Sequence, residues 1–174
     1  AHDSRLGPDD TLPARIIALS ANAIEQFGDI HSPSARINLV ARATNTAPGS
    51  ITLGSAASID VAGQWVNDST LVNGGNPGVA ERFLDGGAVS LLAQGDLTLD
   101  AGSEIDASAG ATAGENGRTR SGRAGSIALA SAIPNQNTLT TLDLRGELRA
   151  YGFGTGGALR LTGVGFRVAE SSSA

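Results

Sequence analysis

The sequence predicts an all-β fold, a right-handed parallel β-helix of about eight coils. Two observations carry this prediction. Short segments in which apolar and polar residues alternate dominate the chain, and similar segments recur along it at variable spacing. The composition agrees, since aromatic residues are 3% of the 174 residues and Gly occurs 24 times. Stacked short strands need small aliphatic side chains inside and turn-forming residues at their corners.

The predicted strands follow from an alternation of period two, because successive side chains of a strand point to opposite faces. These segments are Ile37-x-Leu39-x-Ala41, Ile51-x-Leu53, Ile59-x-Val61, Val89-x-Leu91, Leu97-x-Leu99, Ile105-x-Ala107, Ile127-x-Leu129, Leu142-x-Leu144, Leu148-x-Ala150 and Leu159-x-Leu161. Residues 14–27 show the one pattern that also suits a helix, but Ile17-x-Leu19-x-Ala21 alternates, so a strand is predicted there as well. Gly-, Pro- and Asn-rich turns separate the segments.

A repeated order of segments supports stacking. A Gly- or Ala-rich start before an alternating strand occurs as SARINL (34–39), GGAVSL (86–91), AGSIAL (124–129) and GGALRL (156–161). Two shorter strands follow the first three copies, so that ITLGSAASID from residue 51 returns as LTLDAGSEID from residue 97. An antiparallel β-sandwich is the alternative fold, and it predicts hairpins between successive strands. It gives no reason for the recurrence, so the sequence favours the β-helix.

Charge and composition exclude several classes of site. The net charge of −5 argues against nucleic acid as a partner, because phosphate binding needs a basic surface. The chain has no Cys and only two His, His2 and His31, so neither a metal site nor a cofactor is expected. No run of about 18 apolar residues occurs, which argues against a membrane-spanning helix.

Residues 1–174 are expected to form a single β-helix segment, since no linker divides them. A β-helix exposes strand edges and core residues at both ends, and it needs capping elements there. Neither terminus shows an amphipathic cap helix. We therefore expect the chain to be a segment of a much longer protein.

The longest polar stretch, residues 108–125, is predicted to be a loop extruded from the coils. Arg118, Arg120 and Arg123 lie close together on it, and guanidinium clusters can bind the sulfate or carboxylate groups of acidic glycans. A flexible, solvated loop is the simpler interpretation. Even so, these three residues are the best candidates in the sequence for contacting a partner.

Trp65 is the second candidate for a partner contact, because an exposed Trp could stack on a sugar, although a Trp buried at a corner is more usual.

Asp60 and Asp106 hold equivalent places in the two similar segments. With their copies two coils apart, their carboxylates would lie about 10 Å from each other, and glycosidases need such pairs. No basic residue is beside either Asp in the sequence, so outward-facing turn residues are the favoured interpretation.

GFGTGG (152–157) matches a dinucleotide fingerprint, but a strand pattern follows it, which favours a turn.

Three segments resemble the repeats of filamentous haemagglutinin-like exoproteins, the large adhesins that Gram-negative bacteria export by two-partner secretion. They are GSITLGSAASIDVAGQWVND (49–68), GGAVSLLAQGDLTLDAGSEIDASAGA (86–111) and RAGSIALASA (123–132). The resemblance implies a right-handed parallel β-helix, an extracellular or cell-surface location and an outer-membrane transporter as partner, and it implies no catalytic residue. The family's secretion domain usually carries an Asn-Pro-Asn signature. Only Gly-Asn-Pro-Gly occurs here, at 75–78, so a shaft segment is expected.

The expected function is non-catalytic, structural and adhesive. In this interpretation a stiff shaft presents loops for attachment to host cells, surfaces or biofilm, with a host receptor or a glycan as partner. A carbohydrate-active β-helix enzyme or a glycan-binding module is the alternative. The enzyme would need a groove in which two or more carboxylates converge on one face.

Overall fold

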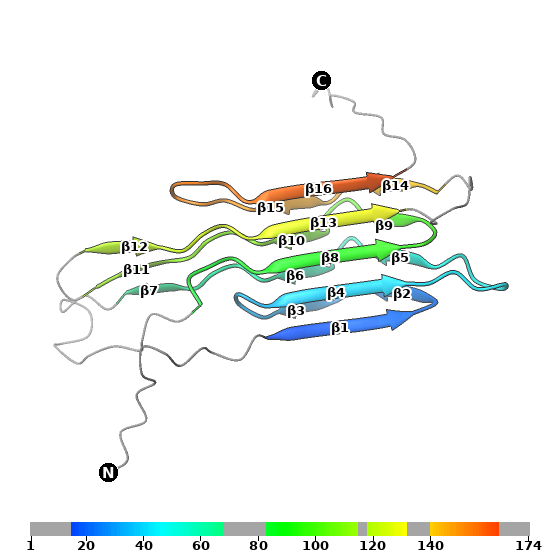
Figure 1. Ribbon diagram of the computed structural model, residues 1–174, viewed down its shortest axis with the longest axis horizontal. Helices are drawn as coiled ribbons and strands as arrows, with labels where there is room; N and C mark the ends of the chain where they lie inside the picture. The colour runs from blue at the N-terminus through cyan, green and yellow to red at the C-terminus, as the bar shows by residue number, and fades with distance from the viewer. Residues whose placement is uncertain (1–14, 68–82, 115–117, 132–139, 164–174) are drawn as a thin grey trace, which may run out of the picture.

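The structure, a computed structural model, describes residues 15–67, 83–114, 118–131 and 140–163 (Figure 1). These ranges are all-β, and every predicted alternating segment overlaps a strand, although three of the segments extend one residue beyond it. The single strand predicted within 14–27 is found as two strands. The strands are β1 (Ile16–Ala21), β2 (Ala23–Gln26), β3 (Asp29–His31), β4 (Arg36–Ala41), β5 (Ser50–Leu53), β6 (Ser58–Asp60), β7 (Trp65–Asn67), β8 (Ala88–Ala93), β9 (Leu97–Leu99), β10 (Glu104–Asp106), β11 (Ala111–Ala113), β12 (Thr119–Ser121), β13 (Ser126–Ser131), β14 (Leu142–Leu144), β15 (Glu147–Arg149) and β16 (Ala158–Gly163). Within the described ranges, no helical segment has the length and hydrophobicity that crossing a membrane requires.

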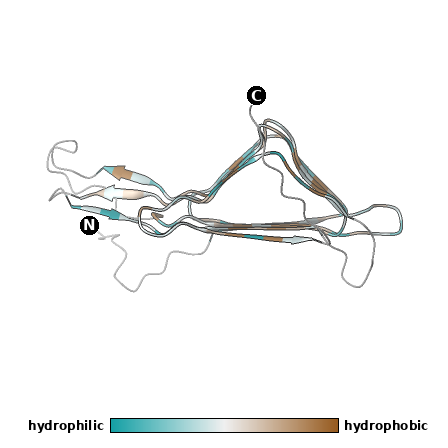
Figure 2. Cartoon of the chain, turned by 90° about the horizontal axis from the view of Figure 1, so that it is seen from above, coloured by the Kyte–Doolittle hydropathy of each residue, from teal (hydrophilic) through white to brown (hydrophobic). Residues whose placement is uncertain are grey.

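Three parallel sheets form the body of the molecule. Sheet A has the order β1-β4-β8-β13-β16, sheet B the order β2-β5-β9-β14 and sheet C the order β3-β6-β10-β15. The chain visits A, B and C in the same sequence each time, and seen from above the three sheets form the sides of a triangle (Figure 2). All strand pairs within these sheets are parallel, which excludes the antiparallel β-sandwich. The arrangement is consistent with a β-solenoid.

The core consists of aliphatic side chains stacked on their counterparts in the neighbouring strands. The second residues of the sheet A strands, in order along the stack, are Ile17, Ile37, Val89, Ile127 and Leu159. Those on the three inner strands are buried, and they join residues of sheets B and C in one cluster. Leu97, Leu99 and Ile105, which the alternation predicts to point inward, are fully buried. On the outer strands β1 and β16 the equivalent side chains are exposed within the described part of the chain.

The repeat length varies because residues are added between strands. The sheet A strands begin at residues 16, 36, 88, 126 and 158, so the repeats are 20, 52, 38 and 32 residues long. The prediction of about eight coils assumed about 20 residues per coil, and it is not confirmed, since no sheet of the described residues has more than five strands. The strands of sheet A nevertheless keep a constant length, because all five have six residues.

The two similar segments of the sequence are direct neighbours in the stack. β5 pairs with β9 and β6 pairs with β10, in both cases between residues 46 positions apart. Asp60 therefore lies opposite Asp106 in adjacent strands. Their expected separation by two coils is wrong, because nothing is stacked between the two copies.

A small fourth sheet projects from one corner of the triangle and is called the arm here (Figures 1 and 2). It contains β7, which follows β6, and the antiparallel pair β11–β12, which follows β10. The stretch predicted as an extruded loop, 108–125, thus holds two strands of the arm. The backbone N–H of Gly110 donates a hydrogen bond to the carbonyl oxygen of Leu84, which ties the base of the arm to the connection that leads into β8. The N–H of Gly122 donates to the carbonyl oxygen of Gly110 and closes the β11–β12 pair at its base.

Leu91 and its neighbour Leu92 allow a direct test of the stacked core, because they adjoin in β8 and point to opposite faces. Leu91 is 0% exposed and Leu92 is 40% exposed. Leu91→Ala is expected to lower the free energy of unfolding by about 2–5 kcal/mol, since it opens a cavity between stacked strands. Leu92→Ala should change it by less than about 1 kcal/mol. Urea unfolding followed by circular dichroism measures both, and equal losses would contradict the assigned inward face.

Candidate functional site

A row of ionisable side chains crosses the outer face of sheet C. The residues His31, Asp60, Asp106 and Arg149 occupy the same register position in β3, β6, β10 and β15. Nδ1 of His31 lies 2.8 Å from Oδ2 of Asp60. The sequence suggested that no basic residue lies beside Asp60 or Asp106, and this expectation is wrong. The parallel register brings His31 next to Asp60 and Arg149 next to Asp106 from distant parts of the chain.

Asp60 and Asp106 perform the same structural task at the ends of their strands. Oδ1 of Asp60 accepts a hydrogen bond of 2.9 Å from the backbone N–H of Ala62, and Oδ1 of Asp106 accepts one of 2.7 Å from that of Ser108. Such bonds to the backbone two residues on stabilise a bend. The prediction that both Asp residues face outward and stabilise turns is confirmed.

Arg149 holds two glutamates on neighbouring strands. Its Nη1 donates to Oε1 of Glu104 at 2.7 Å, while Nε and Nη2 donate to the two carboxylate oxygens of Glu147 at 2.8 and 2.7 Å. The hydrogen bond from Arg149 lowers the pKa of Glu147, and the same bond raises the pKa of Arg149. The bidentate geometry fixes the guanidinium in one orientation on the surface.

Beside Arg149 the surface forms a hollow of about 420 Å³ between the arm and sheet C. We call it the aromatic groove. Its aromatic, charged and hydroxyl-bearing lining residues are Trp65, Asp106, Ser108, Arg149, Tyr151 and Phe153. Trp65, Tyr151 and Phe153 are 72%, 68% and 63% exposed. The rings of Trp65 and Phe153 meet edge to face, with centroids 5.3 Å apart and an interplanar angle of 67°.

Backbone ladders that continue past the ends of the strands position the aromatic groove. The N–H of Ala109 donates to the carbonyl oxygen of Tyr151, and the N–H of Tyr151 donates to the hydroxyl oxygen of Ser108 at 3.0 Å. Trp65 is the first residue of β7, which pairs with β11 in the arm. Three connections that are far apart in the sequence therefore meet at one corner of the body.

The structure places Trp65 on the surface, so the burial that is more usual for a corner Trp is not found. Tyr151 and Phe153 were not among the predicted contact residues. The sequence did carry a signal, since YGFG places two aromatic residues in a Gly-rich turn of a chain with 3% aromatic residues. The GFGTGG stretch that contains Phe153 is a turn followed by β16, as predicted, and no helix follows it.

The three predicted arginines lie on or beside the arm. Arg120 is in β12 opposite Thr112, Arg118 comes just before that strand, and Arg123 follows it. All three are exposed, and the backbone N–H of Arg123 donates to Oδ1 of Asp85 at 2.7 Å. None of them lines the aromatic groove. The structure therefore separates the arginines from Trp65, the other predicted contact residue.

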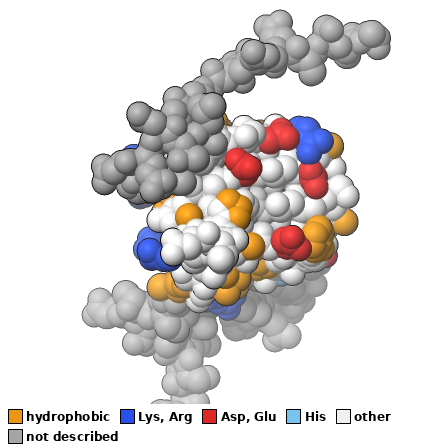
Figure 3. All heavy atoms as spheres, turned by 90° about the vertical axis from the view of Figure 1, so that its right-hand side faces the viewer, with side chains coloured by type: hydrophobic (Ala, Val, Ile, Leu, Met, Phe, Trp, Pro, Cys, Tyr) orange, Lys and Arg blue, Asp and Glu red, His pale blue; other side chains and the backbone are white. Residues whose placement is uncertain are grey.

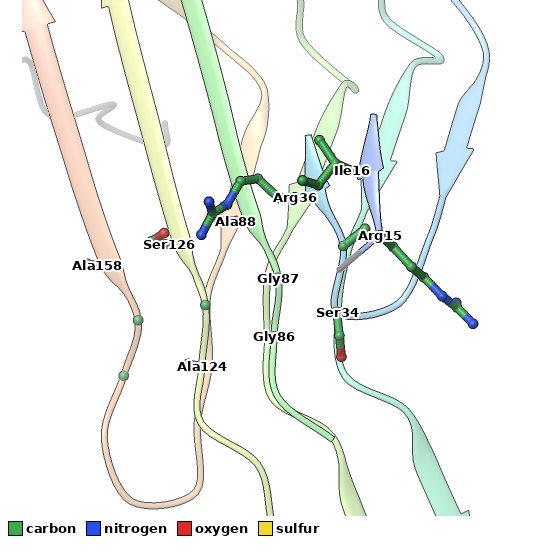
Figure 4. Close-up of a pocket in the computed structure, with 14 residues that line it drawn as sticks. Arg15, Ile16, Ser34, Arg36, Gly86, Gly87, Ala88, Ala124, Ser126 and Ala158 are labelled. Carbon is green, nitrogen blue, oxygen red and sulfur yellow. The ribbon is translucent and has the colours of Figure 1, made fainter. Parts of the chain in front are cut away.

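A larger hollow of about 610 Å³ runs along the corner that leads into sheet A (Figure 4). Its floor is the repeated Gly- and Ala-rich start of the sheet A strands, including Gly86, Gly87 and Ala124, and Arg36 extends across it toward Ser126. A Cβ atom on Gly87 would collide with the backbone oxygen of Ala35 and would lie 2.8 Å from Cβ of Val61. The small residues are thus required by the close stacking of the corners, which accounts for the recurring motif without a ligand.

In the part of the chain that the structure describes, the side of the molecule formed by sheet B contributes no lining residue to either of these two hollows. Figure 3 shows acidic side chains spread over this side and hydrophobic side chains in several separate places. Arg145 lies 2.6 Å from Asp100 and 3.2 Å from Asp143, so its charge is compensated locally. In the described ranges no group of three or more potential ligands could hold a metal ion.

Comparisons with known proteins add no assignment. No family model matches the chain, and neither a curated protein nor a solved structure matches it. The aromatic groove and the charged row beside it are therefore interpreted from their own geometry and chemistry.

Gly87→Ala tests the stacked corner. The added methyl group must displace the backbone of the adjacent turn, so the variant should lose roughly 1–3 kcal/mol of unfolding free energy. Gly28→Ala is the matched control, because a Cβ atom at Gly28 meets nothing within 4 Å. Urea unfolding should leave the Gly28 variant as stable as the wild type or slightly more stable. A Gly87 variant of unchanged stability would show that the corner is loosely packed.

Arg149→Gln is expected to raise the pKa of Glu147 toward its ordinary value of 4.5. Because the pKa is lowered in the folded state, the pair stabilises the fold above the ordinary pKa, and this contribution disappears as the pH falls through the lowered one. NMR titration of the side-chain carboxyl carbon measures the change. Arg145→Gln should leave the pKa of Glu147 where it is, and an equal change in both variants would refute a specific role of Arg149.

Proposed function

We propose that the chain is a right-handed parallel β-helix that closes around one core, and that it is a non-catalytic structural and adhesive segment of a secreted bacterial surface protein. One observation carries the proposal. The arm and the aromatic groove beside it are attached to continuous parallel ladders, so that exposed contact residues are held on a rigid support. The right-handed sense follows from the strong preference of parallel crossover connections.

The parallel ladders supply the mechanical part of this function. Each inner strand of sheets A, B and C is hydrogen-bonded to a neighbour on both sides, as in β4, β8 and β13. A pulling or shearing force along the stack is distributed over the hydrogen bonds of three sheets. Insertions such as the arm lie outside the ladders, so they can vary without weakening the support.

The location and the export partner are part of the same proposal. The repeats that resemble filamentous haemagglutinin-like exoproteins support a location outside the cell or on its surface, with an outer-membrane transporter as the export partner. The complete absence of Cys suits a protein exported to an oxidising environment. Attachment would then involve a host receptor, a surface or a biofilm component.

A carbohydrate-active enzyme is the second candidate, because Asp60 and Asp106 lie side by side and Arg149 is close to Asp106. Each of these carboxylates, however, accepts the backbone hydrogen bond of its own turn. The identical structural task of the two residues favours the non-catalytic function.

Two assays with the purified chain test the proposal. Beads coated with the protein should be retained under flow on epithelial monolayers or on biofilm more strongly than albumin-coated beads. Polygalacturonate and neutral polysaccharides should be recovered uncleaved after incubation. The proposal fails if a polysaccharide is cleaved and Asp106→Asn abolishes the cleavage while Asp143→Asn on sheet B does not. Retention equal to that of albumin would contradict the adhesive part.

A further inference from the structure

We propose that the aromatic groove binds an uncharged carbohydrate, in the form of an oligosaccharide segment rather than a single sugar. The inference rests on the proposed attachment function and adds the chemical class of the ligand and its site. Four observations support it: the exposed rings, the polar groups that line the same hollow, the local charge and the size of the hollow.

The concentration of exposed rings is the first observation. The chain has one Trp, one Tyr and four Phe, and three of these six residues line this one groove. Large exposed aromatic surface is costly in water, and it marks binding surfaces. The faces of a sugar ring that carry C–H groups pack well against aromatic rings. Trp65 and Tyr151 also have a polar group at the edge of the ring that can bond to hydroxyl groups.

The polar groups of the groove match the hydroxyl groups of a sugar. Oδ1 of Asp106 is occupied by the N–H of Ser108, while Oδ2 accepts no hydrogen bond from the residues that the structure describes. The hydroxyl oxygen of Ser108 accepts from the N–H of Tyr151, which leaves its proton free to donate. An acceptor and a donor thus line the same groove as the aromatic side chains, which suits a ligand with both C–H faces and hydroxyl groups better than a wholly apolar one.

The local charge selects an uncharged ligand. Among the described side chains that line the groove, Arg149 is the one cation, and Glu104 and Glu147 bind its guanidinium directly. Asp106 adds a third negative charge that acts on the same guanidinium. One positive charge against three negative ones leaves a net charge of −2 at this site. Sulfated and uronate-rich chains would be repelled here, and their chemistry fits the arginines of the arm instead.

The dimensions of the site point to more than one sugar ring. The volume of about 420 Å³ lies within the range of small-molecule sites. A second hollow of about 240 Å³ lies on the face of the arm, and Trp65 lines both. A chain of sugars can therefore run from sheet C past Trp65 onto the arm.

Trp65 itself provides the measurement, because it is the only Trp of the chain and it lines both hollows, so its fluorescence reports on the whole proposed site. The intact chain is titrated with cellohexaose, maltohexaose and chitohexaose, and separately with a heparin hexasaccharide and a polygalacturonate oligomer. We expect a saturable fluorescence change with at least one neutral oligosaccharide. Tyr151→Ala and Phe153→Ala should each weaken its binding about tenfold.

Phe27→Ala is the matched control, since Phe27 is as exposed as Phe153 but does not line the groove. Its affinity should equal that of the wild type. Circular dichroism and urea unfolding verify that the variants fold, which is expected because the removed rings are exposed. Asp106→Asn keeps an acceptor for Ser108 and should weaken binding less than the loss of a ring.

Three results would overturn the inference. The first is no response to any neutral oligosaccharide at millimolar concentration, and the second is equal weakening by the Phe27 and Phe153 variants. The third is a response only to the anionic oligomers that is lost when Arg118, Arg120 and Arg123 are changed to Ala. Failure of the adhesive function is distinguishable, since it shows in the wild-type bead assay. If beads coated with the Tyr151→Ala, Phe153→Ala double variant adhere as well as beads coated with the wild type, the adhesive function stands and the aromatic groove is not the site responsible for it.

Discussion

The in-register parallel pairing of sheets A, B and C is the constraint on which the rest of the molecule depends. Every residue of the inner strands of sheet A, such as β8, has a partner at the same position of the strand on either side. A side chain that fits inside must therefore fit directly above and below a similar one. Ile37, Val89 and Ile127 meet this condition, whereas a large ring would be forced against its counterparts. The low aromatic content and the small residues at the corners follow from this one requirement.

The same constraint places variation and polar chemistry outside the core. Added residues are tolerated in the connections, where the arm and the turn before β16 arise, because the strands beside them keep their register. Aromatic residues that the stack does not admit lie in these connections, as Trp65, Tyr151 and Phe153 do. A fold that cannot accommodate large rings internally thereby presents them at its surface, where they are available for contact.

The sequence predicts the features that depend on neighbouring residues, but it does not predict those that depend on how the strands stack. Alternation identified the strands and the inward side chains such as Leu97 and Ile105, and the recurrence of similar segments identified the parallel architecture. The number of coils does not follow from the chain length. An insertion such as the arm lengthens a repeat without adding a strand to sheets A, B or C. The groove was missed for a related reason. Trp65 and Phe153 come together only through the register of β6, β10 and β15, and no spacing along the chain expresses that register.

Asp60 and Asp106 show how one structural position can acquire two different surroundings. Both carboxylates fix the turn after their strand with one oxygen. The second oxygen of Asp60 pairs with His31, whereas Asp106 lines a groove together with three aromatic residues. The difference arises from the next strand in the stack and from the turns beyond it, not from the segment that the two residues share. In a solenoid the repeated unit thus provides the geometry, and the irregular connections decide which copy of a residue is able to bind a ligand.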